Sequence, residues 1–230
     1  MTLDVLLLHG CGGSVRSTFA RTGWIATIGA AGRRAIAPDL PGHGAHASVD
    51  PQDYADLAGS VERGLPAGTL DAVGFSLGAK IVLELALRQP ERFRKVVLGG
   101  IGDNLFGPEV FAPVAAEALE APGSAAAAHP AVAPMLQRWE SDLNDARAVA
   151  AVLRRPPNPR FSPERLAQLS IPVLIVNGSD DPVGKKGDLL ARSLRDMRCE
   201  TLPGVDHFGL PGDAAFQRLA LDFLRLKETK

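Results

Sequence analysis

The stretch Val73-Gly74-Phe75-Ser76-Leu77-Gly78-Ala79 decides the fold, because it predicts a strand that ends in a sharp bend and continues into a helix. The glycines on either side of the serine let strand and helix pass close together while Ser76 takes a strained backbone conformation. The bend therefore indicates a nucleophile at its tip, and the helix start offers backbone N–H groups, such as that of Leu77, to developing negative charge. The alternative is a tight turn with an idle serine.

Strand-like and helix-like segments alternate on both sides of this bend. Segments that predict strands lie at 3–8, 33–37, 70–73, 95–99, 173–176 and 198–202, and the runs at 3–8 and 95–99 predict buried strands. Helical patterns cover 16–30, 51–65, 80–87, 109–119, 142–153, 186–194 and 214–226, and Ser162-Pro163 starts a further short helix. The order predicts an α/β fold with a mostly parallel sheet of about six strands and helices on both faces.

Residues 102–169 differ in character, because alanine and proline dominate and β-branched runs disappear. We predict an inserted helical cap here, between two parts of one core at 1–101 and 170–230. Apolar side chains at Phe106, Phe111, Met135, Leu136 and Trp139 give such a cap a surface to bury. A partly disordered linker is the alternative, since 121–134 has low complexity.

Composition narrows the class of protein. The chain has 230 residues and a formal net charge of −1 with scattered basic residues, which disfavours nucleic acid or a membrane surface as the main partner. Its two cysteines, Cys11 and Cys199, are too few for a disulfide framework or a zinc site, and we expect no metal or cofactor. No basic leader or bilayer-length apolar run is present, so we expect a cytoplasmic protein, monomeric or homodimeric, that acts on a small molecule.

A serine hydroxyl needs a base, which is usually a histidine. Catalytic groups in parallel sheets gather beyond the carboxyl ends of the strands, and His207 directly follows the last strand. His9 follows the first strand, but its glycine neighbours suit a backbone role. His43 and His46 are expected to have turn or surface roles, and His129 is expected to be exposed.

The partner acid is expected at a strand end between the serine and the histidine. Asp180 and Asp181 both qualify, and Asp103 is a lower-ranked substitute. Pro182 restricts the turn at Asp181 and pushes that residue out of helical geometry, so we assign the catalytic role to Asp181 and a structural role to Asp180.

With these motifs in place, the chain resembles the α/β-hydrolase fold superfamily, in particular its small esterase and lipase-like branch. The matching motifs are His9-Gly10-Cys11, the turn at 39–44, the elbow at 74–78, the acid turn at 178–181 and His207. The resemblance implies an oxyanion hole made by the N–H groups of Cys11 and Leu77, with the Cys11 thiol incidental. A reactive thiol at Cys11 is the alternative. The antiparallel strands that begin this fold in other members are expected to be missing.

The predicted function is cleavage of carboxylic esters with small to medium apolar groups, by Ser76, His207 and Asp181 through an acyl-enzyme. Aromatic side chains expected near the substrate are Phe75, Phe106, Phe111 and Trp139. Two alternatives stay open: a lyase or carbon–carbon bond hydrolase that uses the same triad, and a binding receptor that has lost turnover. A dehalogenase is disfavoured because it would carry a carboxylate in place of Ser76.

Overall fold

The structure of the protein is a computed structural model. It describes residues 3–44, 47–124, 129, 132–139, 144–156, 161–184 and 187–225. Its described residues form one six-stranded sheet in the order β2-β1-β3-β4-β5-β6, in which every pair of neighbours is parallel. The strands are β1 (Asp4–Leu8), β2 (Ala35–Ile36), β3 (Leu70–Phe75), β4 (Phe93–Gly99), β5 (Val173–Gly178) and β6 (Met197–Leu202). The predicted parallel sheet is confirmed.

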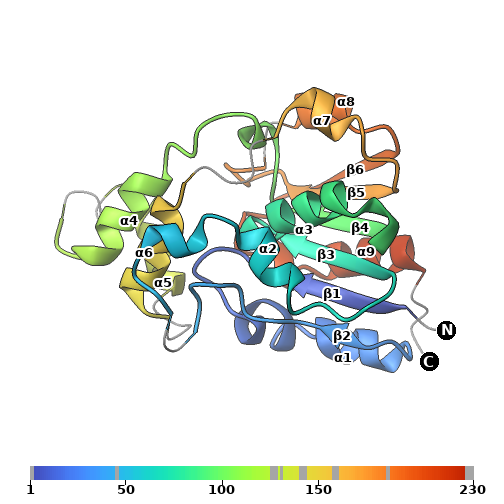
Figure 1. The fold of residues 1–230 in the computed structure, drawn as a ribbon, viewed down its shortest axis with the longest axis horizontal. Coiled ribbons are helices and arrows are strands. Elements are labelled where there is room, and N and C mark those ends of the chain that lie inside the picture. Colours follow the sequence, from blue (N-terminus) through green and yellow to red (C-terminus); the bar gives the residue numbers. More distant parts are fainter. Residues whose placement is uncertain are drawn as a thin grey trace.

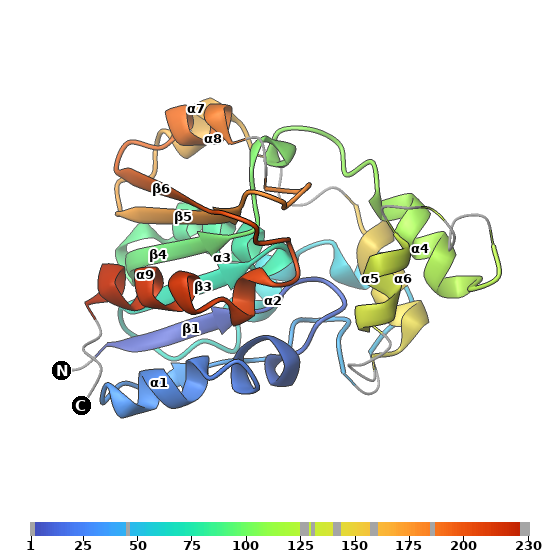
Figure 2. The same ribbon diagram turned by 180° about the vertical axis from the view of Figure 1, so that it is seen from behind.

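Alternate residues of each strand face opposite sides of the sheet, as the two-residue period of a strand requires. In β1, Leu6 and Leu8 belong to one buried cluster, while Val5 and Leu7 belong to the other. Figure 1 shows α2 (Leu57–Glu62) and α3 (Leu77–Arg88) over the first face, and Figure 2 shows α1 (Trp24–Ala30) and α9 (Ala214–Leu224) over the second. The short helices α7 (Pro163–Leu166) and α8 (Asp188–Ser193) complete the first face. Both faces are therefore buried, which explains the continuous apolar runs of the central strands.

Two helices predicted as continuous are interrupted. The segment 16–30 contains a short π-helix, η1 (Arg16–Ala20), and then α1, because Gly23 lies between them with φ +89°. The segment 51–65 starts as a 3₁₀ turn, η2 (Pro51–Tyr54), in which the predicted cap Asp50 accepts a hydrogen bond from the Gln52 N–H. It restarts as α2 because Asp56, in a non-helical conformation, caps a second helix.

Three of the helices that the described chain forms between β4 and β5 lie together beyond the carboxyl ends of the strands (Figures 1 and 2). They are α4 (Ala112–Glu120), α5 (Ala133–Trp139) and α6 (Ala146–Arg154). Their apolar side chains form a separate buried cluster that includes Val132, Trp139 and Val149 and contacts Cys11 of the core. Helix α5 was missed from the sequence, whereas Ser162 caps α7 as predicted. No helix in the described part of the chain is long and apolar enough to cross a membrane.

Candidate active site

Ser76 lies at the tip of the predicted bend, between the end of β3 and the start of α3. Its φ of +53° belongs to a region that non-glycine residues rarely adopt, and its N–H is tied to the Gly99 carbonyl at 2.8 Å. A Cβ on Gly78 would lie 2.1 Å from the Leu8 carbonyl oxygen, and one on Gly74 would lie 2.6 Å from the Ala79 Cα. The glycines are therefore required by close backbone contacts, as the sequence predicted.

The three side chains predicted to form a triad are in hydrogen-bond contact. His207 Nε2 lies 3.1 Å from Ser76 Oγ, and His207 Nδ1 lies 2.9 Å from Asp181 Oδ2. Because a carboxylate only accepts hydrogen bonds, Nδ1 carries the proton and donates it to Asp181, which leaves Nε2 free to accept from the serine. The arrangement brings a nucleophile, a base and an acid together above the carboxyl ends of β3, β5 and β6.

Asp181 is completely buried and held as an anion. Its Oδ1 accepts hydrogen bonds from the N–H groups of Val183 at 2.7 Å and Gly184 at 3.0 Å. Burial acts to raise the pKa of Asp181. The hydrogen bond from His207 and the electrostatic attraction of its Nδ1–H, together with those two N–H groups, outweigh burial and leave the pKa below its ordinary value. The carboxylate therefore keeps its charge while it orients the imidazole.

The other two candidate acids lie elsewhere. Asp180 accepts a hydrogen bond from the Ser179 hydroxyl at 2.9 Å, and Asp103 accepts one from the Leu190 N–H at 2.9 Å. Among the described residues, neither of these two carboxylates forms a hydrogen bond with His207. Asp103 is thereby occupied in joining the loop after β4 to α8.

Asn177, near the end of β5, is a buried residue whose importance sequence reasoning missed. Its Oδ1 accepts from the N–H groups of Gly100 at 3.0 Å and Ile101 at 3.2 Å, and its Nδ2 donates to the carbonyls of Ile101 at 2.9 Å and Gly184 at 3.0 Å. One amide thus joins the loop that follows β4 to the turn that holds Asp181. An asparagine inside an otherwise apolar strand run was the signal that could have indicated it.

Aromatic rings surround the histidine. The Phe75 ring lies 4.9 Å from the His207 ring, and that of Phe208 lies 5.4 Å away, both between centroids. Phe75 is buried, and a Cβ on Gly100 would be 2.8 Å from its ring and 2.9 Å from the His207 ring. Phe75, predicted as a substrate contact, therefore packs against the imidazole of His207. Phe208, whose ring also contacts His207, was not predicted as a site residue.

The loop after β1, residues 10–13, is called the oxyanion loop here after its predicted role. It is a tight turn closed by a hydrogen bond from Gly13 N–H to the Gly10 carbonyl at 3.2 Å. Gly12 has φ +75°, and its N–H donates to His43 Nε2 at 2.8 Å. Burial raises the pKa of the Cys11 thiol to about 12, so at neutral pH the sulfur is a protonated, weak nucleophile. This argues against the reactive-thiol alternative.

His43 was expected in a turn or surface role, and the surface part of that expectation is wrong. The side chain is buried against His9, with their ring centroids 5.0 Å apart. Because Nε2 accepts from Gly12, Nδ1 carries the proton and faces the Pro41 carbonyl at 3.2 Å. Burial, aided by His9, lowers the pKa of His43 to about 3, so the ring is neutral in the folded protein. The turn at 39–44 thus places the His43 side chain in the protein interior and not on the surface.

The remaining aromatic residues predicted to contact substrate lie in different surroundings. Phe106 packs, half-buried, against the first core cluster. Phe111 is 53% exposed and its ring lies 6.3 Å from that of His129, which is exposed as predicted. Trp139 is buried and packs directly on the oxyanion loop: a Cβ on Gly12 would be only 2.0 Å from its Nε1. His46 lies outside the described residues.

A charged cluster lies beside Cys11 and was also missed. Glu109 accepts hydrogen bonds from Lys80 Nζ at 2.7 Å and from Arg155 at 3.2 Å, and these three groups are close enough to influence the Cys11 thiol electrostatically. Lys80 belongs to the first turn of α3, whereas Arg155 follows α6. The cluster therefore links the helix that carries Ser76 to the inserted helices.

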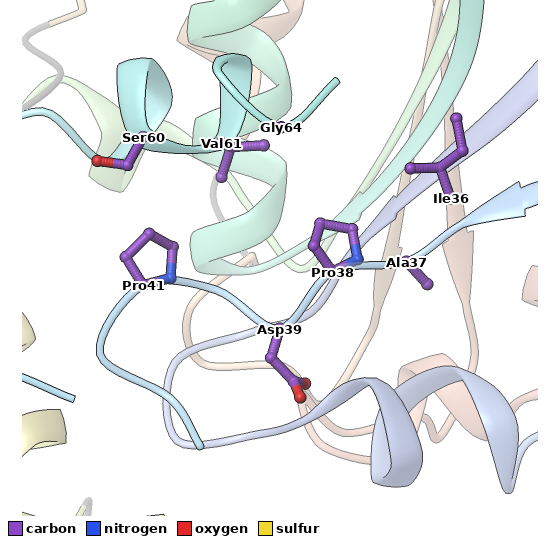
Figure 3. Close-up of a pocket in the computed structure, with 8 residues that line it drawn as sticks. All are labelled: Ile36, Ala37, Pro38, Asp39, Pro41, Ser60, Val61 and Gly64. Atoms are coloured by element: carbon purple, nitrogen blue, oxygen red, sulfur yellow. The ribbon is translucent and has the colours of Figure 1, made fainter. Parts of the chain in front are cut away.

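A hollow of about 340 Å³ lies at the end of β2, apart from the triad (Figure 3). Its walls are Ile36, Ala37, Pro38, Asp39, Pro41, Ser60, Val61 and Gly64. The Asp39 carboxylate is already occupied by the Val15 N–H at 2.7 Å. The hollow therefore offers mostly apolar contacts and no part of the triad.

Comparison with known proteins agrees with this geometry. The model of the alpha/beta hydrolase family matches residues 5–221. The chain belongs to this family. Within it, this alpha/beta hydrolase is 37% identical, over 101 residues, to a 2-hydroxymuconate semialdehyde hydrolase from Pseudomonas sp. (strain CF600). That alignment covers 42% of this chain and 35% of the relative, so the matched part spans about a third of the relative's length.

Solved structures resemble nearly the whole hydrolase. An enol-lactonase from Burkholderia xenovorans LB400 has a TM-score of 0.75 at 20% identity, covering 98% of this chain and 92% of that one. A hydrolase from Pseudomonas aeruginosa PA01 has a TM-score of 0.69 at 25% identity, covering 97% and 90%. The first of these similarities shows the shared fold alone.

Proposed function

We propose that this hydrolase cleaves carboxylic esters through a covalent acyl-serine at Ser76. The observation that carries the proposal is the chain of hydrogen bonds from Asp181 through His207 to Ser76, with the serine held at φ +53° on the start of α3. Each contact has the polarity that nucleophilic catalysis requires, since the free nitrogen faces the hydroxyl and the protonated one faces the carboxylate.

The reaction follows from these positions. His207 Nε2 takes the Ser76 proton as Oγ bonds to the ester carbonyl carbon, and the carbonyl electrons move to the oxygen. When the tetrahedral intermediate collapses, the carbon–oxygen bond to the alcohol breaks and His207 gives the proton to the departing alcohol. Water, deprotonated by the same nitrogen, then bonds to the acyl carbon. The bond from that carbon to Ser76 Oγ breaks, the acid leaves, and His207 returns the proton to Oγ. Asp181 stabilises the imidazolium in both steps.

The N–H groups of Leu77 and Cys11 are proposed as the oxyanion hole. Leu77 is the first residue of α3, so its N–H has no carbonyl one turn earlier to bind. Cys11 lies in the oxyanion loop, whose Gly10 would bring a Cβ within 3.2 Å of the Ser76 Cβ. One such donor is typically worth about 10²–10³ in rate.

For the substrate we propose small to medium apolar acyl or alkyl groups. Support comes from the apolar side chains around the site, where Phe75 and Phe208 flank His207, and Trp139 covers the oxyanion loop. Aromatic contacts of this kind favour carbon chains over charged groups.

The test is hydrolysis of p-nitrophenyl esters of graded chain length by the wild type and Ser76→Ala, with fluorophosphonate labelling and identification of the modified peptide. Asn104→Asp is a control, because Asn104 is an exposed residue of the loop after β4. We expect loss of nearly all activity in Ser76→Ala and labelling at Ser76. Unlabelled Ser76, or activity that survives its removal, would contradict the proposal.

A second candidate is hydrolysis of a carbon–carbon bond, favoured by the 37% identity to a 2-hydroxymuconate semialdehyde hydrolase. In that reaction the same three side chains move protons without forming an ester intermediate. Rapid quenching followed by mass spectrometry of the intact protein separates the two. An acyl group on Ser76 supports the esterase, whereas turnover of a vinylogous 1,5-diketone without such an adduct supports the carbon–carbon hydrolase.

A further inference from the structure

The oxyanion loop has little rigidity of its own. Three of its four residues, Gly10, Gly12 and Gly13, are glycines, which restrict the backbone less than any other residue. An N–H group can act as an oxyanion donor only if it is already fixed before the reaction, because reorientation during the reaction costs the stabilisation it supplies. Groups outside the loop must therefore fix the position of the Cys11 N–H.

Two side chains from distant segments bind the peptide groups that follow Cys11. His43 accepts the Gly12 N–H at 2.8 Å from one side. From the other side, Asn144 Nδ2 donates to the Gly12 carbonyl at 2.9 Å and to the Gly13 carbonyl at 3.1 Å. The two residues together occupy both polar groups of Gly12.

Asn144 also binds the turn that carries His43. Its Oδ1 accepts the Gly44 N–H at 2.8 Å, so a single amide joins the oxyanion loop to the turn at 39–44. Asn144 lies just before α6, next to Asp145, which caps that helix by accepting the Arg147 N–H. Its amide therefore reaches the loop only when the start of α6 sits against the core as it does here.

We propose that Asn144 is a positioning residue, which holds the oxyanion loop in its donating geometry and makes that geometry depend on the placement of the inserted helices. The inference rests on the proposed function. Asn144 touches the peptide groups beside the donor and acts through them, with His43 as its counterpart on the opposite side of Gly12.

The test uses Asn144→Asp in the full chain. The introduced carboxylate has nearly the same shape and still accepts from Gly44, but it faces the Gly12 and Gly13 carbonyls without a proton to donate. On p-nitrophenyl butyrate we expect kcat to fall roughly 10- to 100-fold, less than the loss of a whole oxyanion donor, with KM within about threefold. Asn104→Asp, which retains its acceptor bond from Gly102 N–H, is the matched control and should stay near wild type.

A pH profile separates positioning from mere structural support. Protonation of the introduced carboxyl restores a donor, so the ratio of variant to wild-type kcat should rise several-fold as the pH falls from 7 toward the ordinary pKa of a carboxyl, about 4. The ratio for Asn144→Leu should stay low and constant. A variant ratio that is independent of pH, or a kcat within threefold of wild type, overturns the inference.

The rate of fluorophosphonate labelling at Ser76 gives a readout that does not depend on the ester chosen. The phosphoryl oxygen occupies the same hole during attack, so Asn144→Asp should label at least about tenfold more slowly than wild type. If wild type labels readily but turns over no ester, the proposed reaction fails while this inference is still decided by the labelling rates. Equal rates for the two proteins would reject it.

Discussion

Gly12→Ala is a sharp test of how the inserted helices meet the core. The native φ of +75° costs a non-glycine residue about 1–2 kcal/mol. The new Cβ would also lie 2.0 Å from Trp139 Nε1 and 2.1 Å from its Cδ1, so the buried indole must move. Overpacking of this kind costs about 1–3 kcal/mol more. We therefore expect a total loss of roughly 2–5 kcal/mol in the free energy of unfolding.

Gly32→Ala is the matched control. Gly32 has φ +72°, nearly that of Gly12, but a Cβ there meets nothing within 4 Å. It should lose only the conformational part, about 1–2 kcal/mol. Because the two substitutions share their chemistry and their backbone angle, the difference between them measures the contact with Trp139.

Urea unfolding followed by circular dichroism gives both values, and a double-mutant cycle assigns the difference. In a Trp139→Ala background the indole is gone, so Gly12→Ala should cost no more than Gly32→Ala. If the two glycine variants are equally destabilised with Trp139 present, the indole does not pack on the oxyanion loop, and the reasoning is refuted.

Three further predictions concern buried polar groups. His43 is neutral when folded, with a pKa of about 3 against 6.5 unfolded, so its contribution is complete above pH 6.5 and is lost as the pH falls toward 3, by about 1.4 kcal/mol per pH unit. The urea midpoint should therefore fall with pH less steeply in His43→Gln than in wild type. Asp181→Asn should lower kcat by about 10³–10⁴, since the imidazole loses its carboxylate acceptor. Asn177→Leu leaves three backbone groups unpaired, since the Gly100 N–H still donates to the Val176 carbonyl. It should cost about 3 kcal/mol or more in unfolding, whereas Asn104→Leu on the surface should cost far less.

The sheet and the three side chains of the candidate triad were within reach of sequence reasoning for one physical reason. In a parallel sheet the carboxyl ends of all strands share an edge, so Ser76, Asp181 and His207, each directly after a strand-like run, are expected to converge there. The central strands were recognisable because both of their faces are buried, which makes their sequences continuously apolar. Long-range placement followed here from local patterns.

Helix boundaries and buried polar partners were less accessible. The break at Gly23 depends on a positive φ that an apolar period does not reveal, and α5 lies in an alanine- and proline-rich segment with a weak pattern. Asn177 and Asn144 make their hydrogen bonds with segments up to 132 residues away. No local spacing specifies such partners, because they are decided only when separate loops meet in space.

Gly12 must be glycine for two separate physical reasons, its backbone conformation and the lack of space for a side chain. Read in the sequence, the run Gly10, Gly12 and Gly13 suggests a loop that needs freedom to expose N–H groups. In the structure Gly12 has almost no freedom, since His43 takes its N–H, Asn144 takes its carbonyl and Trp139 fills the space of a side chain. Its positive φ and the missing space both require glycine, but only the second depends on the inserted helices. Replacing Trp139 should therefore make room for a side chain at position 12, while the positive φ continues to favour glycine there. A glycine needed only for loop flexibility would not respond to the loss of Trp139 in this way.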